Sequence, residues 1–305
     1  MKKFLCGLLA ISLLVFGGCT TKSVYETENR IVATSFYPVY VFTLNLLNGI
    51  EGVEVRCMAE QNIGCLHDYS LTAKDVRLLE DAEVLVINGA GMEGFIEDVY
   101  RNAENLQIID SSVGIELLCN SEEHSHEDEE DGEHHHEENS HIWLSLDNAG
   151  TQVENIKKSL VEAFPEYEKE ISSNYNSYIK RINGLEEVRD GYSKEISGIT
   201  VISFHSAYEY LAAETGLVIL DTVESDEGGE PSAKKLTKLC EEIEHHSVKA
   251  LFTEPTYEGN AADILCAETG VEVFVLNPVT KGDGSLTSYE DIMKSNYEII
   301  YKAVK

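Results

Sequence analysis

Short apolar runs alternate with amphipathic stretches from Arg30 to the end of the chain. Continuous apolar runs of this length are typical of buried strands, and apolar positions spaced by three and four residues indicate helices. The predicted strands are Ile31–Phe36, Val53–Met58, Val84–Asn88, Leu106–Ile109, Ile199–Phe204, Leu217–Val223, Lys249–Phe252 and Val271–Leu276. The predicted helices between them are Val39–Asn48, Thr72–Leu79, Gly94–Ala103, Ala207–Glu214, Ser232–His246, Asn260–Thr269 and Tyr289–Val304. Strands that alternate with helices predict parallel sheets, so we expect an α/β protein with two lobes, each a small, mostly parallel sheet flanked by helices.

The joint between the two lobes also has a helical pattern. Asp147–Phe164 is predicted to be a helix, and Pro165 ends it. Residues 166–196 contain no proline, and a single helix of that length would extend about 45 Å, which favours a long rigid linker. An interruption at Gly191, giving two shorter helices, is the alternative. The predicted lobes are therefore residues 30–165 and 197–305, on either side of a linker helix at 166–196.

The first 19 residues have the features of a secretory signal. Lys2 and Lys3 precede the apolar stretch Phe4–Phe16, which is too short to span a bilayer as a mature helix. Small residues then lead to Cys19, so we predict a lipoprotein signal peptide with a lipobox and a lipid anchor on Cys19. Residues 20–29 are small and polar and are interpreted as a tether. The mature protein is then expected outside the cytoplasm, anchored to a bacterial cell membrane.

The charge of the chain restricts its partners. It carries 55 acidic and 23 basic residues among 305, a formal net charge of −32. No basic excess is available to neutralise phosphates, so nucleic-acid binding is excluded from the expected functions. A strongly acidic protein attracts cations instead.

Residues 121–140 read SEEHSHEDEEDGEHHHEENS and contain no apolar side chain. Such a segment cannot bury a core, so it is predicted to be a disordered loop. It also contains five histidines: His124, His126, His134, His135 and His136. Neutral imidazole binds divalent transition metals, so we expect this loop to collect metal ions loosely.

Three histidines outside that loop lie near the predicted ends of strands or directly after the loop. His67 follows the strand that ends at Met58, His141 comes directly after the acidic loop, and His205 closes the first strand of the second lobe. Ligand sites of open α/β sheets form at the carboxyl ends of strands, so these histidines are candidates for one shared site. His245 and His246 end a predicted helix, where they offset the helix dipole.

The cysteines suggest no metal or redox motif. After removal of the signal and lipidation of Cys19, the five that remain are Cys57, Cys65, Cys119, Cys240 and Cys266. Five is an odd number, so at least one is unpaired within the chain, and none has CxxC spacing. Cys65, two residues before His67, is the only one considered as a possible ligand.

Several motifs resemble those of the zinc- and manganese-specific substrate-binding lipoproteins of ABC transporters, the ZnuA-like proteins with the TroA-type fold. The resemblance covers nearly all of residues 30–305. The motifs are Ala33-Thr-Ser-Phe-Tyr-Pro38, His67-Asp-Tyr, Val86-Ile-Asn-Gly-Ala-Gly-Met-Glu93, His141-Ile-Trp-Leu, Phe204-His-Ser-Ala-Tyr-Glu-Tyr-Leu211, Glu230-Pro-Ser232, Phe252-Thr-Glu-Pro255 and Leu276-Asn-Pro278. An acidic, histidine-rich loop before the second ligand is a feature of the zinc-handling branch.

The resemblance implies that His67, His141 and His205 bind the metal. Manganese members have a glutamate at the third place, so His205 favours Zn²⁺, and Mn²⁺ is the weaker candidate. Many members have an aspartate at the place of Asn277, whose amide is a poor ligand. The fourth ligand therefore stays open between Asn277, Glu254, water and a carboxylate from elsewhere.

The function implied is capture of Zn²⁺ in the cleft between the lobes and delivery to an ABC permease by a monomeric, membrane-anchored protein that is not an enzyme. The alternatives are manganese transport, a zinc hydrolase and an adhesin. Three histidines and a water also suit a hydrolase, but the chain has no HExxH, no G-x-S-x-G and no phosphate-binding glycine loop. No sequence feature marks an adhesive surface.

Overall fold

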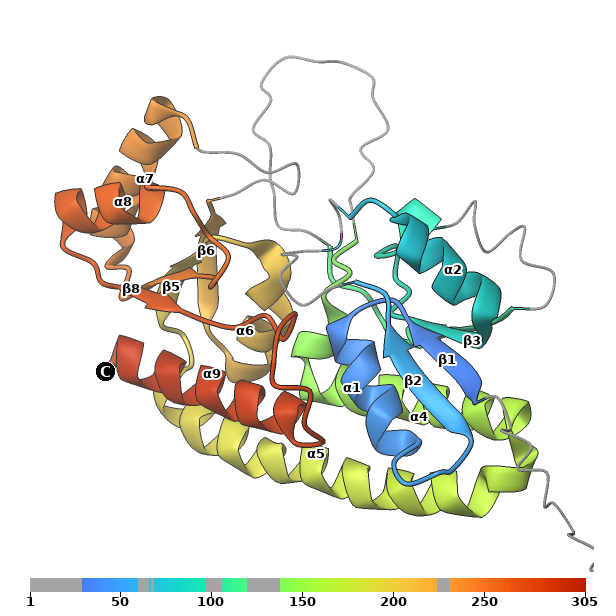
Figure 1. Ribbon diagram of the computed structural model, residues 1–305. Coiled ribbons are helices and arrows are strands. Elements are labelled where there is room, and N and C mark those ends of the chain that lie inside the picture. Colours follow the sequence, from blue (N-terminus) through green and yellow to red (C-terminus); the bar gives the residue numbers. More distant parts are fainter. Residues whose placement is uncertain (1–28, 60–65, 67–68, 97–105, 120–137, 224–230) are drawn as a thin grey trace, which may run out of the picture.

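Two four-stranded parallel sheets form the centre of the computed structural model, which describes residues 29–59, 66, 69–96, 106–119, 138–223 and 231–305 (Figure 1). The first sheet has the order β2-β1-β3-β4, with β1 (Arg30–Thr34), β2 (Val53–Cys57), β3 (Ala82–Ile87) and β4 (Gln107–Asp110). The second has the order β6-β5-β7-β8, with β5 (Thr200–Ser203), β6 (Val218–Thr222), β7 (Leu251–Thr253) and β8 (Val273–Val275). The two sheets share one strand order, and the predicted fold of two parallel α/β lobes is confirmed.

Helices pack around both sheets (Figure 1). Their bounds are α1 (Tyr37–Leu46), α2 (Ala73–Asp81), α4 (Leu146–Ala163), α5 (Glu168–Ile196), α6 (Glu209–Thr215), α7 (Ala233–His246), α8 (Ala261–Thr269) and α9 (Ser288–Val304). One predicted helix lies mostly outside the described residues. Where the pattern predicted Gly94–Ala103, only a 3-10 turn over Gly94–Ile96 is observed, and residues 97–105 lie outside the described part. None of the helices within the described ranges is both long and apolar enough to cross a bilayer.

Local sequence signals explain where several helices begin and end. The Thr72 hydroxyl accepts a hydrogen bond from the Asp75 amide, and the Asp75 carboxylate accepts one from the Thr72 amide, which completes a capping box for α2. Helix α4 has a simpler cap, in which the Ser145 hydroxyl accepts a hydrogen bond from the Asn148 amide. Helix α6 ends at Gly216, whose φ of 76° is a left-handed conformation that glycine adopts without strain.

Helix α5 is one continuous helix of 29 residues, so the prediction of a long linker helix is confirmed. Gly191 does not interrupt it. Glycine within a helix costs roughly 1 kcal/mol, and this cost is offset because the helix buries Tyr178, Ile182 and Leu185 against its neighbours. Helix α5 packs on α1 and α4 of the first lobe and on α6 and α9 of the second. One hydrophobic cluster therefore extends through both lobes, from Val32 to Val304.

Polar contacts reinforce this connection. Glu214, in α6 of the second lobe, accepts hydrogen bonds from the Ser145 hydroxyl at 2.5 Å and from the Leu146 amide at 3.1 Å, at the start of α4. The Trp143 indole donates to the Pro278 carbonyl at 2.7 Å. The lobes are thus held together by side chains as well as by the linker. The predicted limits of the lobes, 30–165 and 197–305, stay predictions.

Candidate metal centre

His141 follows directly after residues that the sequence pattern had assigned to the disordered loop. Its side chain is buried, with 2% of the residue exposed. The His141 backbone amide donates to the Asn139 side-chain oxygen at 3.0 Å, and the His141 Nδ1 atom lies 2.9 Å from the same oxygen. Asn139 and Ser140 are themselves buried, at 1% and 3% exposure. The predicted disordered segment 121–140 is therefore too long at its end, because Asn139 and Ser140 belong to the packed structure.

His205 comes from the other lobe, two residues after β5 ends. The Ser203 hydroxyl donates to the His205 carbonyl at 2.6 Å, which fixes the turn. The His205 Nδ1 atom lies 2.5 Å from a carboxylate oxygen of Glu254, and both side chains are nearly buried. Burial strengthens this contact, because little water competes for either partner.

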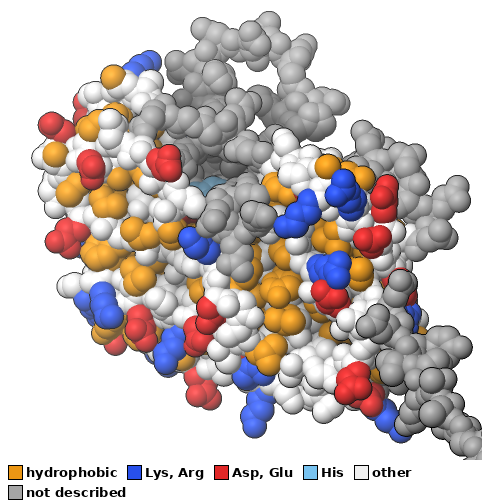
Figure 2. Space-filling view, in the orientation of Figure 1, with side chains coloured by type: hydrophobic (Ala, Val, Ile, Leu, Met, Phe, Trp, Pro, Cys, Tyr) orange, Lys and Arg blue, Asp and Glu red, His pale blue; other side chains and the backbone are white. Residues whose placement is uncertain are grey.

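The two imidazole rings meet between the lobes. Their centroids are 4.7 Å apart with an interplanar angle of 86°, and the ring of Trp143 lies 5.2 Å from that of His141. Figure 2 shows histidine surface in the hollow between the two halves of the molecule. The structure thus brings together two of the three predicted histidine ligands, which come from opposite lobes.

His67 lies outside the described residues. Its neighbours Leu66 and Tyr69 are both buried, and Tyr69 donates a hydrogen bond from its hydroxyl to Asp75 in α2. Within the described part of the chain, no group of three or more His, Cys, Asp or Glu side chains is close enough to hold a metal ion. Whether His67 completes a triad with His141 and His205 therefore stays a prediction.

The two candidates for the fourth ligand have different surroundings. Glu254 contacts the Nδ1 atom of His205, so its carboxylate lies beside that ring. Asn277 uses its amide within its own turn, where the oxygen accepts from the Val279 amide at 2.8 Å and the nitrogen donates to the Lys281 carbonyl at 2.9 Å. These contacts favour Glu254 over Asn277 as the residue that acts near the histidines.

A buried carboxylate that the sequence reasoning did not single out supports the segment before His141. Glu93 accepts hydrogen bonds from the Ser35 hydroxyl, the Asn88 amide and the Gly89 amide. Burial is the largest influence on Glu93 and raises its pKa to about 7, although these three bonds act in the opposite direction. The Asn88 side chain in turn donates to the Ser140 carbonyl at 3.0 Å. Glu93 thus orders the loop after β3 that supports Ser140.

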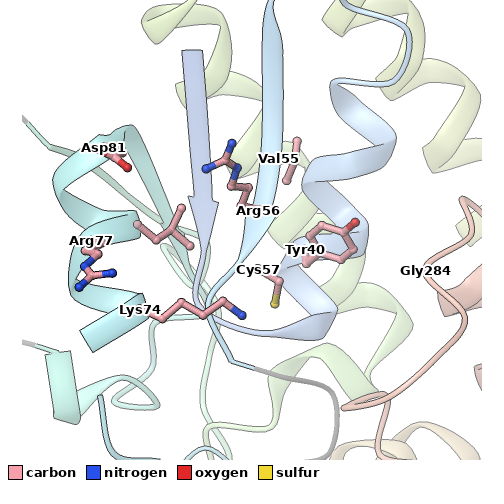
Figure 3. A pocket seen from close by; sticks show the side chains of 9 residues that line it. Tyr40, Val55, Arg56, Cys57, Lys74, Arg77, Asp81 and Gly284 are labelled. Atoms are coloured by element: carbon pink, nitrogen blue, oxygen red, sulfur yellow. The ribbon is translucent and has the colours of Figure 1, made fainter. Parts of the chain in front are cut away.

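A cavity of about 600 Å³ lies elsewhere, between α1, β2 and α2 (Figure 3). Arg56, Lys74 and Arg77 line it, and Lys74 extends across it toward Cys57. Burial raises the pKa of the Cys57 thiol to about 12, so this cysteine is protonated near neutral pH. A protonated thiol in a lining of three cations and one carboxylate, Asp81, disfavours a metal ion. This cavity is therefore not the metal centre.

The other histidines and cysteines considered from the sequence fall into two groups. His245 and His246 are exposed at the end of α7, with ring centroids 4.6 Å apart, as expected for residues at a helix C-terminus. The five loop histidines, Cys19 and Cys65 lie outside the described residues. Within the described ranges, the cysteines Cys57, Cys119, Cys240 and Cys266 form no disulfide.

Two parallel α/β lobes that share a cleft and are bridged by a long helix define a solute-binding protein. The family described as "Zinc-uptake complex component A periplasmic" (ZnuA) matches residues 32–303, and the chain belongs to this family.

Two curated relatives carry zinc in their names. The high-affinity zinc uptake system protein ZnuA of Bacillus subtilis (strain 168) is 30% identical over 297 residues, which cover 93% of this chain and 91% of the relative. The zinc-binding protein AdcA of Streptococcus pyogenes serotype M3 is 27% identical over 318 residues. That match covers 98% of this chain but only 61% of AdcA, so the chain spans about three fifths of the length of this relative.

Solved structures agree with the fold. The solute-binding protein FpvC of Pseudomonas aeruginosa superimposes with a TM-score of 0.77 at 25% identity, covering 90% of this chain and 97% of FpvC. FpvC is described in complex with Ni²⁺ in one structure and with Mn²⁺ in another. One protein of this architecture has therefore been described with two different divalent metals.

Proposed function

We propose that the protein captures Zn²⁺ in the cleft between its lobes and delivers it to an ABC permease for uptake. The proposal depends most on the position of His141 and His205, which come from opposite lobes and lie with their rings 4.7 Å apart. We assign His67 as the third nitrogen ligand. Three neutral imidazoles leave the charge of the ion uncompensated, and Glu254 places a carboxylate directly outside this ligand set.

Zinc is favoured over manganese because of the donor atoms. Imidazole nitrogen suits Zn²⁺, whereas Mn²⁺ prefers carboxylate and water oxygens. The complexes of FpvC with Ni²⁺ and Mn²⁺ make manganese the second candidate. Titration of the metal-free protein with each ion, in competition with a chelator of known affinity, tests the choice. Zinc is expected to bind more tightly, and tighter binding of manganese would overturn this assignment.

The proposal includes the location of the protein. We infer that Cys19 is lipidated and that residues 20–29 tether the folded part to the outer face of the cytoplasmic membrane. A protein held there meets incoming zinc and stays close to the permease. The acidic, histidine-rich loop then raises the local zinc concentration near the cleft.

Replacing Glu254 by glutamine is expected to weaken zinc binding by about 10- to 100-fold, the usual effect of losing a hydrogen-bonding partner of a ligand histidine. The change removes the negative charge beside His205 but keeps the shape of the side chain. The dissociation constant from chelator competition measures the effect. The exposed Glu258, four residues away, provides the matched control Glu258→Gln, which is expected to bind zinc like the unaltered protein.

The spectrum of bound Co²⁺ separates the two roles open to Glu254. Loss of a ligand changes the coordination number and hence the d–d bands, whereas loss of a partner of His205 leaves the coordination number unchanged. We expect the bands of the Glu254→Gln variant to keep their intensity. A clear change of intensity would show that Glu254 is itself the fourth ligand.

Shortening the histidine-rich loop is expected to lower the total zinc bound while leaving the tight site unchanged. Cys119 and Glu138 form an antiparallel bridge, so the ends of the loop are adjacent. Replacing residues 121–137 by one glycine would join them through Asn-Gly, a preferred two-residue hairpin turn, and would retain Asn139. Isothermal titration measures both binding phases. Loss of the tight phase would mean that a loop histidine is a ligand of the tight site.

A further inference from the structure

The side chain of Asn139 connects the two segments that carry the described histidines. Its nitrogen lies 2.9 Å from the Ser206 carbonyl oxygen and 2.9 Å from a carboxylate oxygen of Glu209. The Ser206 carbonyl can only accept a hydrogen bond, and an ionised Glu209 carboxylate can also only accept one. This end of the amide must therefore be the NH₂ group. The chemistry of the neighbours therefore determines the orientation of the amide.

The opposite end of the amide must then be the oxygen, and it faces His141. It accepts from the His141 backbone amide and lies 2.9 Å from the His141 Nδ1 atom. An amide oxygen carries no proton, so a hydrogen bond at this place requires the proton to be on Nδ1. In a neutral imidazole with Nδ1 protonated, the Nε2 atom has the free lone pair.

We propose that Asn139 is a positioning residue, which holds His141 as the Nδ1–H tautomer so that its Nε2 lone pair faces the metal before any metal arrives. This inference rests on the proposed zinc-binding function. A histidine side chain in water prefers the other tautomer, with the proton on Nε2. The metal-free protein must therefore itself favour the Nδ1–H form of His141. The Asn139 side chain also fixes the ring orientation, because its oxygen accepts from the His141 backbone amide and lies beside the His141 Nδ1 atom.

Asn139 also couples the histidines of the two lobes. Ser206 is the residue after His205, and Glu209 begins α6, so the amide binds the segment that presents His205. The Tyr210 hydroxyl donates to the Asn139 carbonyl at 2.7 Å and so holds the backbone as well. One buried side chain thus contacts the His141 ring and binds the segment that carries His205 in the metal-free protein.

Only an amide of this length can both accept a hydrogen bond from His141 and donate hydrogen bonds to the second lobe. Aspartate would keep an acceptor for His141 but would lose the donor and place a carboxylate beside Glu209. Leucine would have neither function. Replacing Asn139 by these two residues therefore separates the orientation of the ring from the bond to the second lobe.

Nitrogen-15 NMR of the imidazoles, in the metal-free protein at about pH 8 where an ordinary imidazole is neutral, tests the proposal. In the unaltered protein, the His141 signals are expected to show a protonated Nδ1 and an unprotonated Nε2. Asn139→Leu is expected to shift the ring toward Nε2–H and to weaken zinc binding by about 10- to 100-fold. Asn139→Asp is expected to keep the Nδ1–H signature. If Asn139→Leu does not fold, Asn139→Ala provides the same comparison without added bulk.

Asn296 provides the matched control. It is equally buried, at 1% exposure, and its amide bonds both the backbone amide and the carbonyl of Asn277. Asn296→Ala is expected to destabilise the second lobe without changing the His141 tautomer. An unchanged tautomer in the Asn139→Leu and Asn139→Ala variants, or a lost one in Asn139→Asp, would overturn the proposal. The tautomer is read without zinc, so failure of zinc binding in the unaltered protein would refute the proposed function alone.

Discussion

Zinc affinity is expected to fall by about 100-fold or more when His205 is replaced by alanine. Loss of a hydrogen-bonding partner outside a ligand histidine already costs about 10- to 100-fold, and loss of the ligand itself removes a metal–nitrogen bond as well. The site cannot recover by a shift of the backbone, because the turn around His205 is held by Ser203 and the lobes are tied together by α5. His141→Ala and His67→Ala are expected to act in the same way.

Competition with a chromophoric chelator measures these affinities. Trp143 is the only tryptophan of the chain and lies 5.2 Å from His141, so its fluorescence provides a second readout of binding. The exposed His246 gives the control His246→Ala, which is expected to leave the tight site intact. Wild-type affinity in the three ligand variants would rule out the assigned site.

Trp143→Ala is expected to have the largest effect on stability. The side chain is fully buried, it packs edge-on against Phe36 with ring centroids 4.9 Å apart, and its indole binds the Pro278 carbonyl of the other lobe. Truncation of a buried tryptophan costs about 3–5 kcal/mol through lost transfer free energy and the cavity left behind. That is a large part of the roughly 5–15 kcal/mol by which a typical protein is stable.

Urea denaturation followed by circular dichroism measures this loss for the metal-free protein. Trp143→Phe keeps most of the ring packing but loses the hydrogen bond to Pro278, a net contribution of about 1 kcal/mol. We therefore expect it to be clearly more stable than Trp143→Ala. Equal stability of the two variants would mean that the ring does not fill the interface between the lobes as described.

These expectations share a physical basis. The lobes of this protein are joined by a continuous helix and a continuous core, and Glu214 binds the start of α4 across the interface. His141 and His205 are therefore held in place by packing and not by the metal. A site prepared in advance loses less conformational entropy when the ion binds, which favours high affinity.

The sequence by itself was enough to predict most of the architecture. Strand–helix alternation predicted two parallel sheets, and a stretch without proline predicted a helix over 166–196, which is observed as Glu168–Ile196. These features follow from patterns within ten to thirty residues of one another, so they can be read without knowledge of the packing. The motif resemblance also singled out His141 and His205, two histidines that the structure places side by side.

A local pattern was wrong where a tertiary contact decides whether a polar residue is buried. The polar residues Asn139 and Ser140 read as the end of a disordered loop, yet they are buried because the second lobe supplies the partners of Asn139. Composition records only that a side chain is polar, and whether it is solvated or buried depends on what packs against it.

Only the tertiary structure decided how the candidate site is assembled. Glu254 is 49 residues from His205, and Glu209 is 70 residues from Asn139, so no local spacing relates these pairs. Asn277 was a candidate ligand by its place in a motif, but its amide binds Val279 and Lys281 in its own turn. Secondary structure follows from neighbours along the chain. The contacts that orient the His141 and His205 rings come from residues that only the folded chain brings beside them.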